Sequence, residues 1–413
     1  MENRIADIHL SSEGMKKITW AWQFMPVLRS LSEEYTSKAP LKGLKLAACL
    51  HLEAKTACLL ITLHKLGAEV WAAGSNPLST QDDICAALVD NGVHVYSHHG
   101  MTTEEYHENL RFVLSIAPDV IVDDGADLIA TLHTEFPQLI PNVRGGSEET
   151  TTGIKRLKAM EADGTLQFPM IAVNDAYSKY LFDNRYGTGQ SVMDGLMRTT
   201  NMLIAGKKVV VVGYGWCGRG VAMRAKSLGA SVIVVEVDPH RAFEALMDGH
   251  EVMNMTEAAS VGDIFLTLTG NTKVIRKEHF EKMKSGVLLA NAGHFDVEIC
   301  KKDLSQMASS VESTRENIET YTLTDGRRLH LLGEGRLVNL ACADGHPIEI
   351  MDLSFALQLE SALHVAHNKL QSGVHPVPSA IDRRVMEVKL ESLGISLEKL
   401  TDEQELYMKS WEE

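Results

Sequence analysis

A glycine-rich turn is the first feature of the chain whose residue types and spacing could do chemistry. Gly213-x-Gly215-x-x-Gly218 follows an apolar run and precedes a helical stretch. Glycines at this spacing let the backbone approach a pyrophosphate, and the helix that follows offers free N–H groups to the phosphates. Glu236 ends the next apolar run, where a carboxylate binds a ribose diol and repels a 2′-phosphate. The pattern predicts a dinucleotide site that favours NAD over NADP. The nearby Arg241 argues against that preference, and a glycine turn without a ligand is the alternative.

Several polar clusters outside this turn combine carboxylates with histidine, lysine and amide side chains, as general acid–base catalysis requires. They are His51, Asp123-Asp124-Gly-Ala-Asp127, Ser147-Glu148-Glu149-Thr150-Thr151-Thr152-Gly153, Asn174-Asp175, Lys179, Asp183-Asn184, Gly293-His294-Phe295-Asp296 and Gly345-His346-Pro347. Each has a structural alternative. Lys179 could form a plain salt bridge, His51 could be a buried histidine of the core, and Asp123 fits a carboxylate that caps backbone N–H groups.

Alternating strands and helices must position these clusters. The apolar runs predict strands at 44–50, 69–73, 93–96, 119–122, 207–212, 231–235, 263–268 and 287–290, and helices at 53–66, 80–91, 221–228 and 349–368. This order is typical of α/β proteins with parallel sheets. We expect two doubly wound, Rossmann-like domains plus a short C-terminal helical segment.

The expected domains divide the chain at two polar crossings. Residues 1–182 and 345–390 would form a discontinuous substrate domain, 190–343 the cofactor domain, and 391–413 a segment for subunit contact. Hinges at 183–189 and 343–347 would let the domains close over a ligand and exclude water.

Composition excludes several other classes of protein. Of 413 residues, 45% are hydrophobic and 23% charged, as in ordinary globular proteins, and the net charge of −15 disfavours generic binding to nucleic acid or anionic membranes. No apolar run reaches the ~20 residues of a membrane span, and the N-terminus lacks a signal-peptide pattern. The six cysteines form no CxxC pair, so neither a metal site nor a disulfide framework is predicted, and we expect a cytoplasmic protein.

Eight runs carry a family resemblance and are, in order, SNPLSTQDD, VDDGADL, GSEETTTG, VNDAYSKYLFDNRYGTGQS, VVGYGWCGRG, VEVDP, NAGHFDVEI and EGRLVNLACADGHP. With them, nearly the whole chain resembles one known family, the adenosylhomocysteinases. The resemblance implies a homotetrameric hydrolase that holds NAD without net redox and cleaves the thioether between a nucleoside C5′ and homocysteine. Transient oxidation at C3′ would acidify the C4′ hydrogen, so that the thiolate can leave and water can add.

The resemblance also implies roles for individual residues. It assigns deprotonation of the 3′-hydroxyl to Lys179 and Asn184, the ribose hydroxyls to Asp183 and Glu149, and acid–base work near C4′ and C5′ to Asp124. The resemblance further implies that His51 and His294 handle the leaving thiol and the incoming water. It implies substrate contacts at Glu53, Lys55, Thr56, Gln81, Asp344 and His346. It implies cofactor contacts at Thr150, Thr151, Thr152, Gly213, Gly215, Gly218, Glu236, Arg241, Thr269, Asn291 and Asn339.

The chain departs from the family at His51-Leu-Glu53-Ala-Lys55-Thr56. Common members carry Glu or Gln at the position of Lys55 and Thr at that of Glu53. The Glu accepts a hydrogen bond from the adenine amino group, whereas lysine can only donate. Lysine suits the 6-carbonyl of hypoxanthine, and Glu53 or Asp344 could accept its N1–H. We therefore expect S-inosyl-homocysteine as substrate; the alternatives are that Lys55 merely pairs with Glu53 or faces solvent and adenine is still bound.

Two further points bear on function. The C-terminal QELYMKSWEE lacks the Lys- and Tyr-bearing tail that reaches the neighbouring subunit's cofactor in familiar members, and Arg241 stands where Asn is usual.

The rival classes are a dehydrogenase that releases reduced cofactor and a non-catalytic NAD-binding regulator.

Overall fold

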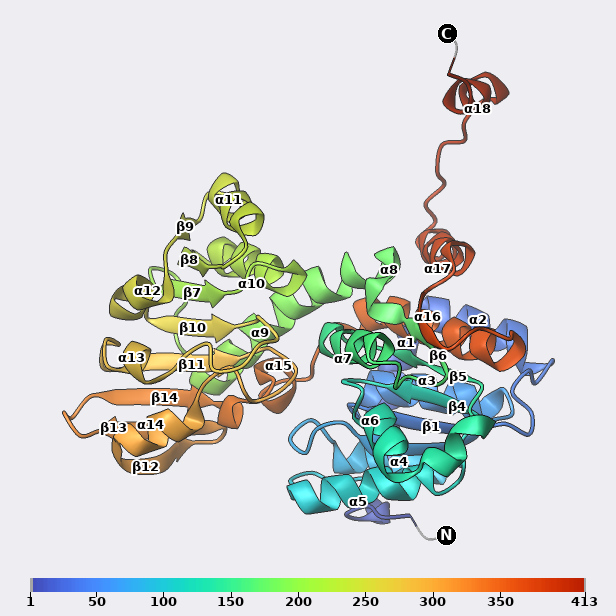
Figure 1. Ribbon diagram of the computed structural model, residues 1–413, viewed down its shortest axis with the longest axis horizontal. Helices are drawn as coiled ribbons and strands as arrows, with labels where there is room; N and C mark the ends of the chain where they lie inside the picture. Colours follow the sequence, from blue (N-terminus) through green and yellow to red (C-terminus); the bar gives the residue numbers. More distant parts are fainter. Residues whose placement is uncertain (1–2, 412–413) are drawn as a thin grey trace.

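The computed structural model describes residues 3–411 and places their strands in two separate β-sheets (Figure 1). The first sheet has the order β15-β6-β5-β4-β1-β2-β3, and all its neighbouring strands are parallel. Its strands are β1 Lys45–Leu50, β2 Glu69–Gly74, β3 His94–Tyr96, β4 Val120–Asp123, β5 Gly145–Glu148, β6 Pro169–Ala172 and β15 Gly373–Pro376. The last of these returns from the far end of the chain to complete the sheet.

The second sheet has the order β12-β13-β14-β11-β10-β7-β8-β9. Its strands are β7 Lys208–Val212, β8 Ser231–Val235, β9 Glu251–Val252, β10 Ile264–Thr267, β11 Val287–Asn291, β12 Ala308–Arg315, β13 Ile318–Leu323 and β14 Arg328–Leu332. The pairs β12–β13 and β13–β14 are antiparallel, and the others are parallel. The prediction of two parallel α/β sheets is confirmed, but this antiparallel edge was missed because most of β12 is polar and exposed.

Helices cover both faces of each sheet. Alternate residues of β1 and of β7 pack into different hydrophobic clusters, which is typical of a parallel sheet buried on two sides. The helices that follow the chain are α1 Ser11–Gln23, α2 Pro26–Thr36, α3 Ala54–Lys65, α4 Asp82–Asp90, α5 Thr103–Leu114, α6 Asp127–Glu135, α7 Thr151–Ala162, α8 Tyr177–Tyr180, α9 Thr188–Thr200, α10 Trp216–Ser227, α11 Pro239–Met247, α12 Met255–Val261, α13 Lys277–Phe280, α14 Lys301–Met307, α15 Val338–Ala341, α16 Ile348–His367, α17 Ser379–Ser392 and α18 Asp402–Lys409. None of the helices in this described part of the chain is long and apolar enough to cross a membrane.

The two crossings between the sheets are more helical than the polar sequence predicts. The first contains 3₁₀ turn η3 (Val173–Asp175), α8, π-helical turn η4 (Asp183–Gly187) and α9. Glycines here serve close packing: a Cβ on Gly189 would lie 2.6 Å from the Gly220 carbonyl oxygen. The second crossing contains α15 and leads directly into α16.

The C-terminal segment leaves the body of the molecule and ends in α18 (Figure 1). Its apolar side chains are exposed; they are Leu393, Ile395, Leu397, Leu400, Leu406, Tyr407, Met408 and Trp411. The predicted subunit-contact segment covers this region, although its residues 412 and 413 lie outside the described residues, as do residues 1 and 2 of the predicted substrate domain. The role of the segment stays a prediction.

Candidate active site

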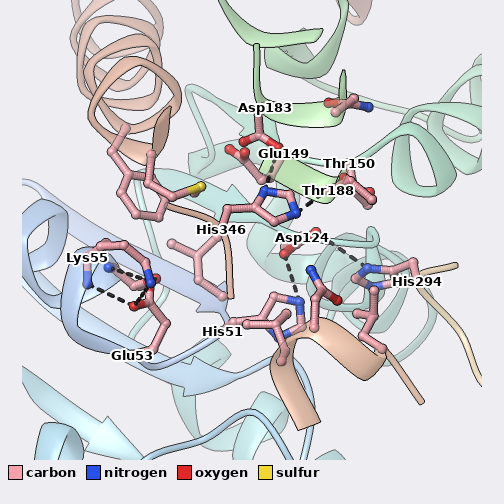
Figure 2. A pocket seen from close by; sticks show the side chains of 18 of the residues that line it. His51, Glu53, Lys55, Asp124, Glu149, Thr150, Asp183, Thr188, His294 and His346 are labelled. Carbon is pink, nitrogen blue, oxygen red and sulfur yellow. Dashed lines mark hydrogen bonds and ion pairs between the residues drawn. The ribbon is translucent and has the colours of Figure 1, made fainter. Parts of the chain in front are cut away.

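A cavity lies between the two sheets and is lined by residues from both (Figure 2). In a parallel sheet the carboxyl ends of the strands lie at the same edge. The loops that follow β1, β4 and β5 of the first sheet meet the loop that follows β11 of the second sheet at the cavity. The structure brings together most of the predicted catalytic and substrate residues, and those that line the cavity are His51, Glu53, Lys55, Thr56, Asp124, Glu149, Lys179, Asp183, Asn184, His294 and His346. Two predicted cofactor residues, Thr150 and Asn339, line it as well.

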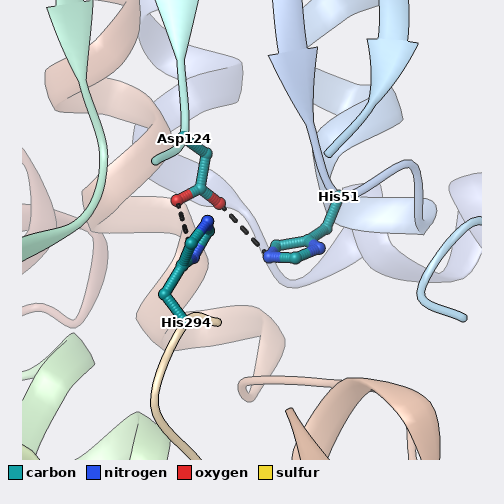
Figure 3. A group of neighbouring side chains, drawn as sticks. All are labelled: His51, Asp124 and His294. Atoms are coloured by element: carbon teal, nitrogen blue, oxygen red, sulfur yellow. Dashed lines mark ion pairs between the residues drawn. The ribbon is translucent and has the colours of Figure 1, made fainter. Parts of the chain in front are cut away.

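Two histidines flank a carboxylate at one end of the cavity (Figure 3). His51 Nε2 lies 3.3 Å from Asp124 Oδ2, and His294 Nδ1 lies 3.6 Å from Asp124 Oδ1. Burial is the main cause that lowers the pKa of His51 to about 4, so its ring is neutral at neutral pH. Burial thus disfavours a charged His51 ring, while the adjacent Asp124 carboxylate favours it.

His51 also contacts Ser79. Its Nδ1 lies 2.6 Å from the Ser79 hydroxyl oxygen, which is itself 3.1 Å from the Asn76 carbonyl oxygen. This contact orients the imidazole so that its Nε2 faces the carboxylate of Asp124.

A buried lysine occupies the centre of a second polar group. Lys179 Nζ donates to Asn184 Oδ1 at 2.9 Å and lies 3.4 Å from Glu149 Oε1 and 3.5 Å from Asp183 Oδ1. Burial alone would lower the pKa of Lys179, but the carboxylates of Asp183 and Glu149 raise it above its usual value. Lys179 is thus a charged donor that is surrounded by several acceptors. The alternative interpretation proposed only a plain salt bridge for it.

The pKa values of the two carboxylates beside this lysine are shifted in opposite directions. Burial raises the pKa of Glu149 to about 7, even though Lys179 acts to lower it. Glu149 Oε2 accepts from Gln358 Nε2 at 2.6 Å, while Oε1 is buried without a hydrogen-bond partner and is free to bind a ligand hydroxyl. Burial opposes ionisation of Asp183, but Lys179 and His346 outweigh it and keep its pKa below the usual range.

Glu148, one residue before Glu149, holds two loops of the site together and was not predicted to do so. Its carboxylate accepts from the main-chain N–H groups of Gly125 at 2.9 Å, Ala126 at 3.0 Å and Thr150 at 2.9 Å. Gly125 and Ala126 both have positive φ (103° and 61°), so successive N–H groups converge on one anion. Gly153 makes room for this carboxylate, because a Cβ there would lie 2.2 Å from it.

The base-recognition residues of the prediction lie at the other end of the cavity (Figure 2). Lys55 Nζ lies 2.8 Å from Glu53 Oε2 and donates to the main-chain carbonyl of Asp344 at 2.6 Å. Glu53 is the N-cap of α3 and accepts from the main-chain N–H groups of Lys55 and Thr56. The ion pair between Lys55 and Glu53 that the alternative interpretation proposed is thus present, and it lies in the wall of the cavity and not in solvent.

Two predicted substrate residues point elsewhere. The Asp344 carboxylate pairs with Arg198 at 2.7 Å and its side chain is 77% exposed, so only its main chain meets Lys55. Gln81 accepts from Lys17 Nζ at 3.1 Å and is not among the residues that line the cavity.

The glycine turn fits a dinucleotide. A Cβ on Gly218 would lie 1.9 Å from the Gly213 carbonyl oxygen, and Gly213 has a φ of 99°, so both positions require glycine. Gly215 precedes α10 and provides no side-chain cap, which leaves the N–H groups of the helix start free for phosphates. Glu236 accepts from the Tyr214 N–H at 2.7 Å and thus lies at this turn. Arg241 is close to Gly215 as well.

Other predicted cofactor residues border the same cleft in different ways. Asn339 Oδ1 is buried without a hydrogen-bond partner, as expected of a ligand contact. Thr152 lies near Gly270, so the loops after β5 and β10 face one another. Thr151 Oγ1 accepts from Asn174 at 2.9 Å, Thr269 donates to Glu298, and the Asn291 amide donates to the carbonyls of Gly293, Phe295 and Gly335. Asn291 therefore orders the loop that carries His294.

A fold of this kind, with a dinucleotide turn in one half and a polar cavity shared with the other, defines an NAD-dependent α/β enzyme. Family comparison agrees: residues 2–136 match the model described as S-adenosyl-L-homocysteine hydrolase, and 184–345 match its NAD binding domain. The chain belongs to the S-adenosyl-L-homocysteine hydrolase family, and it is a hydrolase of the thioether bond with NAD as cofactor.

Relatives with two different names are equally similar to this chain. It is 59% identical over 410 residues to the adenosylhomocysteinase of Pyrococcus abyssi, covering 99% of this chain and 97% of the relative. It is also 59% identical over 415 residues to the S-inosyl-L-homocysteine hydrolase of Methanopyrus kandleri (100% and 98%), and 56% identical over 411 residues to that of Methanocaldococcus jannaschii (99% and 99%). Overall identity thus does not distinguish between the two purines.

Proposed function

We propose that this enzyme hydrolyses S-inosyl-L-homocysteine to inosine and L-homocysteine, reversibly, in the recycling of a methyl donor. The observation that carries the proposal is the ammonium group of Lys55, buried in the cavity wall between Glu53 and the main-chain carbonyl of Asp344. Neither partner leaves the lysine free to swing into solvent, since its side chain is only 6% exposed.

The hydrogen-bonding capacity of this group suits hypoxanthine. An ammonium has three N–H donors, of which Glu53 and the Asp344 carbonyl take two, so one remains for an acceptor on the base. Hypoxanthine offers its 6-carbonyl oxygen, whereas adenine offers a 6-amino group that would face the ammonium donor to donor. We propose that the adjacent Glu53 carboxylate accepts the N1–H that hypoxanthine has and adenine lacks, in exchange for the Thr56 hydroxyl that now donates to its Oε1 at 3.2 Å.

The alternative substrate is S-adenosyl-L-homocysteine, which the names of relatives such as the Pyrococcus abyssi enzyme favour. For adenine, the Lys55 donor would have to bind N1 and leave the amino group to a carbonyl. A polar mismatch in a buried site built around hydrogen bonds costs about 10⁴-fold or more in discrimination.

We also propose roles for the chain's residues in the reaction. Lys179 and Asn184 bind the 3′-hydroxyl and promote loss of its proton, while Asp183 and Glu149 orient the ribose. Bound NAD supplies a hydride acceptor for the substrate's C3′ and returns the hydride at the end.

The remaining proton transfers fall to the group at the other end of the cavity. Asp124 removes the C4′ proton, the C5′–S bond breaks, and the sulfur leaves as a thiolate. The proton taken from C4′ passes from Asp124 to the thiolate through the adjacent His51 and His294. When water adds at C5′, its proton passes back through the same three groups to C4′. Proximity of all three groups in one buried cluster supports this assignment.

The same proposal includes the domain organisation, the cellular location and the oligomeric state of the enzyme. Residues 1–182 and 345–390 bind the substrate and 190–343 the cofactor, which the match of the NAD-binding model at 184–345 supports. We propose that the enzyme is a cytoplasmic homotetramer; that its six cysteines are all unpaired is consistent with a reducing compartment.

The decisive experiment measures homocysteine release from both thioethers by the purified enzyme with NAD bound. We expect kcat/KM for the inosyl compound to exceed that for the adenosyl compound by about 100-fold or more. Equal values, or a preference for the adenosyl compound, would refute the inosyl proposal. Net formation of reduced cofactor in proportion to turnover would instead indicate a dehydrogenase.

A further inference from the structure

Arg156 of α7 has no role in the proposed reaction, yet its side chain is fixed beside the turn that carries Asp124. Its Nη1 donates to the main-chain carbonyl of Gly125 at 2.5 Å and lies 2.6 Å from Asp127 Oδ1. The other oxygen of Asp127 accepts from the Tyr106 hydroxyl at 2.9 Å, so this carboxylate is held from two sides. The guanidinium group is therefore anchored to the half of the molecule that contains the first sheet.

The face of the same guanidinium group meets an aromatic ring from the other half. Arg156 Cζ lies 5.7 Å from the centroid of the Phe295 ring, within the range of a cation–π contact. The hydrogen bonds of a guanidinium group lie in its plane and leave its faces free, so both kinds of contact are compatible. The Phe295 ring in turn meets the ring of His294 at 84°, with 4.7 Å between the centroids.

The loop that carries His294 and Phe295 is fixed from behind by the second half of the molecule. The Asn291 side chain donates to the Phe295 carbonyl at 3.0 Å, and Lys301 Nζ lies 2.6 Å from Asp296 Oδ2. These contacts shape the loop, but they all lie on the side of the second sheet. They do not determine how close the loop comes to the first sheet.

The contact between the catalytic groups themselves is too long to hold the loop there. His294 Nδ1 lies 3.6 Å from Asp124 Oδ1, which is beyond the distance of a hydrogen bond (Figure 3). The contact between Arg156 and Phe295 is one residue away from His294 and joins the same two loops. It therefore supplies an attachment between the halves that the catalytic pair does not.

We propose that Arg156 is a positioning residue, which holds the Phe295 ring and thereby keeps His294 opposite Asp124 during the reaction. The Arg156 side chain is 36% exposed, so water competes for the contact and the two halves can separate when substrate enters or product leaves. The effect on the reaction rests on the proposed catalytic role of His294. The contact itself does not depend on that role or on which purine the enzyme accepts.

A pair of substitutions in the enzyme with NAD bound tests this role. Arg156→Lys keeps a positive charge beside Asp127 but has no planar face for the ring, and Phe295→Leu keeps an apolar side chain without the ring. We expect each to lower kcat/KM for the preferred thioether about 5-fold, mainly through kcat. The double variant should lose no more than either single variant, because both changes remove the same contact. Phe295→Tyr restores a ring and should rescue the loss.

Hydrogen exchange of the main chain measures the contact without any substrate. We expect the amides of 292–296 to exchange faster in both single variants than in wild type, since the loop has lost its attachment to the first half. Arg111→Lys is the matched control, because Arg111 pairs with Glu135 on the surface and should change neither exchange nor rate. Thermal unfolding shows whether each variant is folded.

Three outcomes would overturn the proposal. They are losses of kcat/KM that add up in the double variant, exchange at 292–296 that stays at the wild-type rate, and faster exchange with unchanged kcat/KM. Additive losses would mean that Arg156 only braces Gly125 and Asp127. The ratio of kcat/KM for the inosyl and adenosyl compounds in wild type tests the proposed function separately.

Discussion

At the residue scale, the proposed preference between the two purines depends on one charge in the cavity wall, that of Lys55. We predict that Glu53→Thr combined with Lys55→Glu, the pair common in the family the sequence resembles, lowers kcat/KM for S-inosyl-L-homocysteine about 100-fold and raises it for the adenosyl compound. The double change avoids placing two carboxylates 2.8 Å apart, where Lys55 and Glu53 now pair.

Steady-state rates on both thioethers check this prediction. Lys158→Glu provides the control, because Lys158 pairs with Asp175 on the surface and should leave both rates unchanged. If the double variant keeps the wild-type ratio of the two kcat/KM values, Lys55 does not determine which purine the enzyme prefers.

The raised pKa of Glu149 makes folding stability depend on pH. Burial raises this pKa from an ordinary 4.5 to about 7, so the native state holds a proton that the unfolded state has lost. This contribution to the free energy of unfolding is present below pH 4.5 and falls by about 1 kcal/mol per pH unit as the pH rises towards 7. Denaturant unfolding at several pH values should show this slope in wild type relative to Glu149→Gln. Parallel curves for the two proteins would contradict it.

At the element scale, the loops after β4 and β5 are joined by a single carboxylate. Glu148 fixes the turn that carries Asp124 and the turn that carries Glu149, and it does so through main-chain N–H groups. We predict that Glu148→Gln lowers kcat about 10-fold or more, because an amide cannot accept all three hydrogen bonds and Asp124 loses its position.

A partial-reaction measurement separates positioning from general destabilisation. Since Asp124 is proposed to act after oxidation at C3′, reduced cofactor should accumulate during turnover by Glu148→Gln, visible in its near-ultraviolet absorbance. Glu135→Gln, on the exposed Arg111 pair, should behave as wild type. A uniform loss of all steps without accumulation would show that Glu148 is only structural.

Most sheet elements were predictable from local pattern. The run at 207–212 appears as β7 and the one at 231–235 as β8, because β-branched residues buried on two faces leave a clear signal. The sequence predicts a hinge at 183–189, which stays a prediction, and the structure shows helical turns there that the polar sequence did not indicate. Gly189 packs against Gly220 of α10 and Gly187 against His346 and Ile350, which are contacts between distant residues that a local pattern does not reveal.

At the scale of the whole molecule, the exposed C-terminal segment is the main unexplained surface. Eight apolar side chains within 393–411 are exposed in the single chain, which is costly unless another surface covers them. We predict that a chain ending at Ser392 has a smaller assembly than the full-length protein, measured by light scattering. The double substitution Leu397→Ser and Leu406→Ser should act in the same direction, and an unchanged mass for both would contradict a role in subunit contact.

The sequence by itself determined the fold class and the dinucleotide turn, because glycine spacing and strand patterns are local features, and its resemblance to the adenosylhomocysteinases indicated the class of enzyme. It also indicated Lys55 as the exceptional residue. Only the tertiary structure decided that Lys55 meets the carbonyl of Asp344 instead of its carboxylate, that Glu148 binds two loops, and that His51 and His294 share Asp124. These contacts join residues from different strands and different sheets. They form only when the sheets pack, so they could not be predicted from the order of residues in the chain.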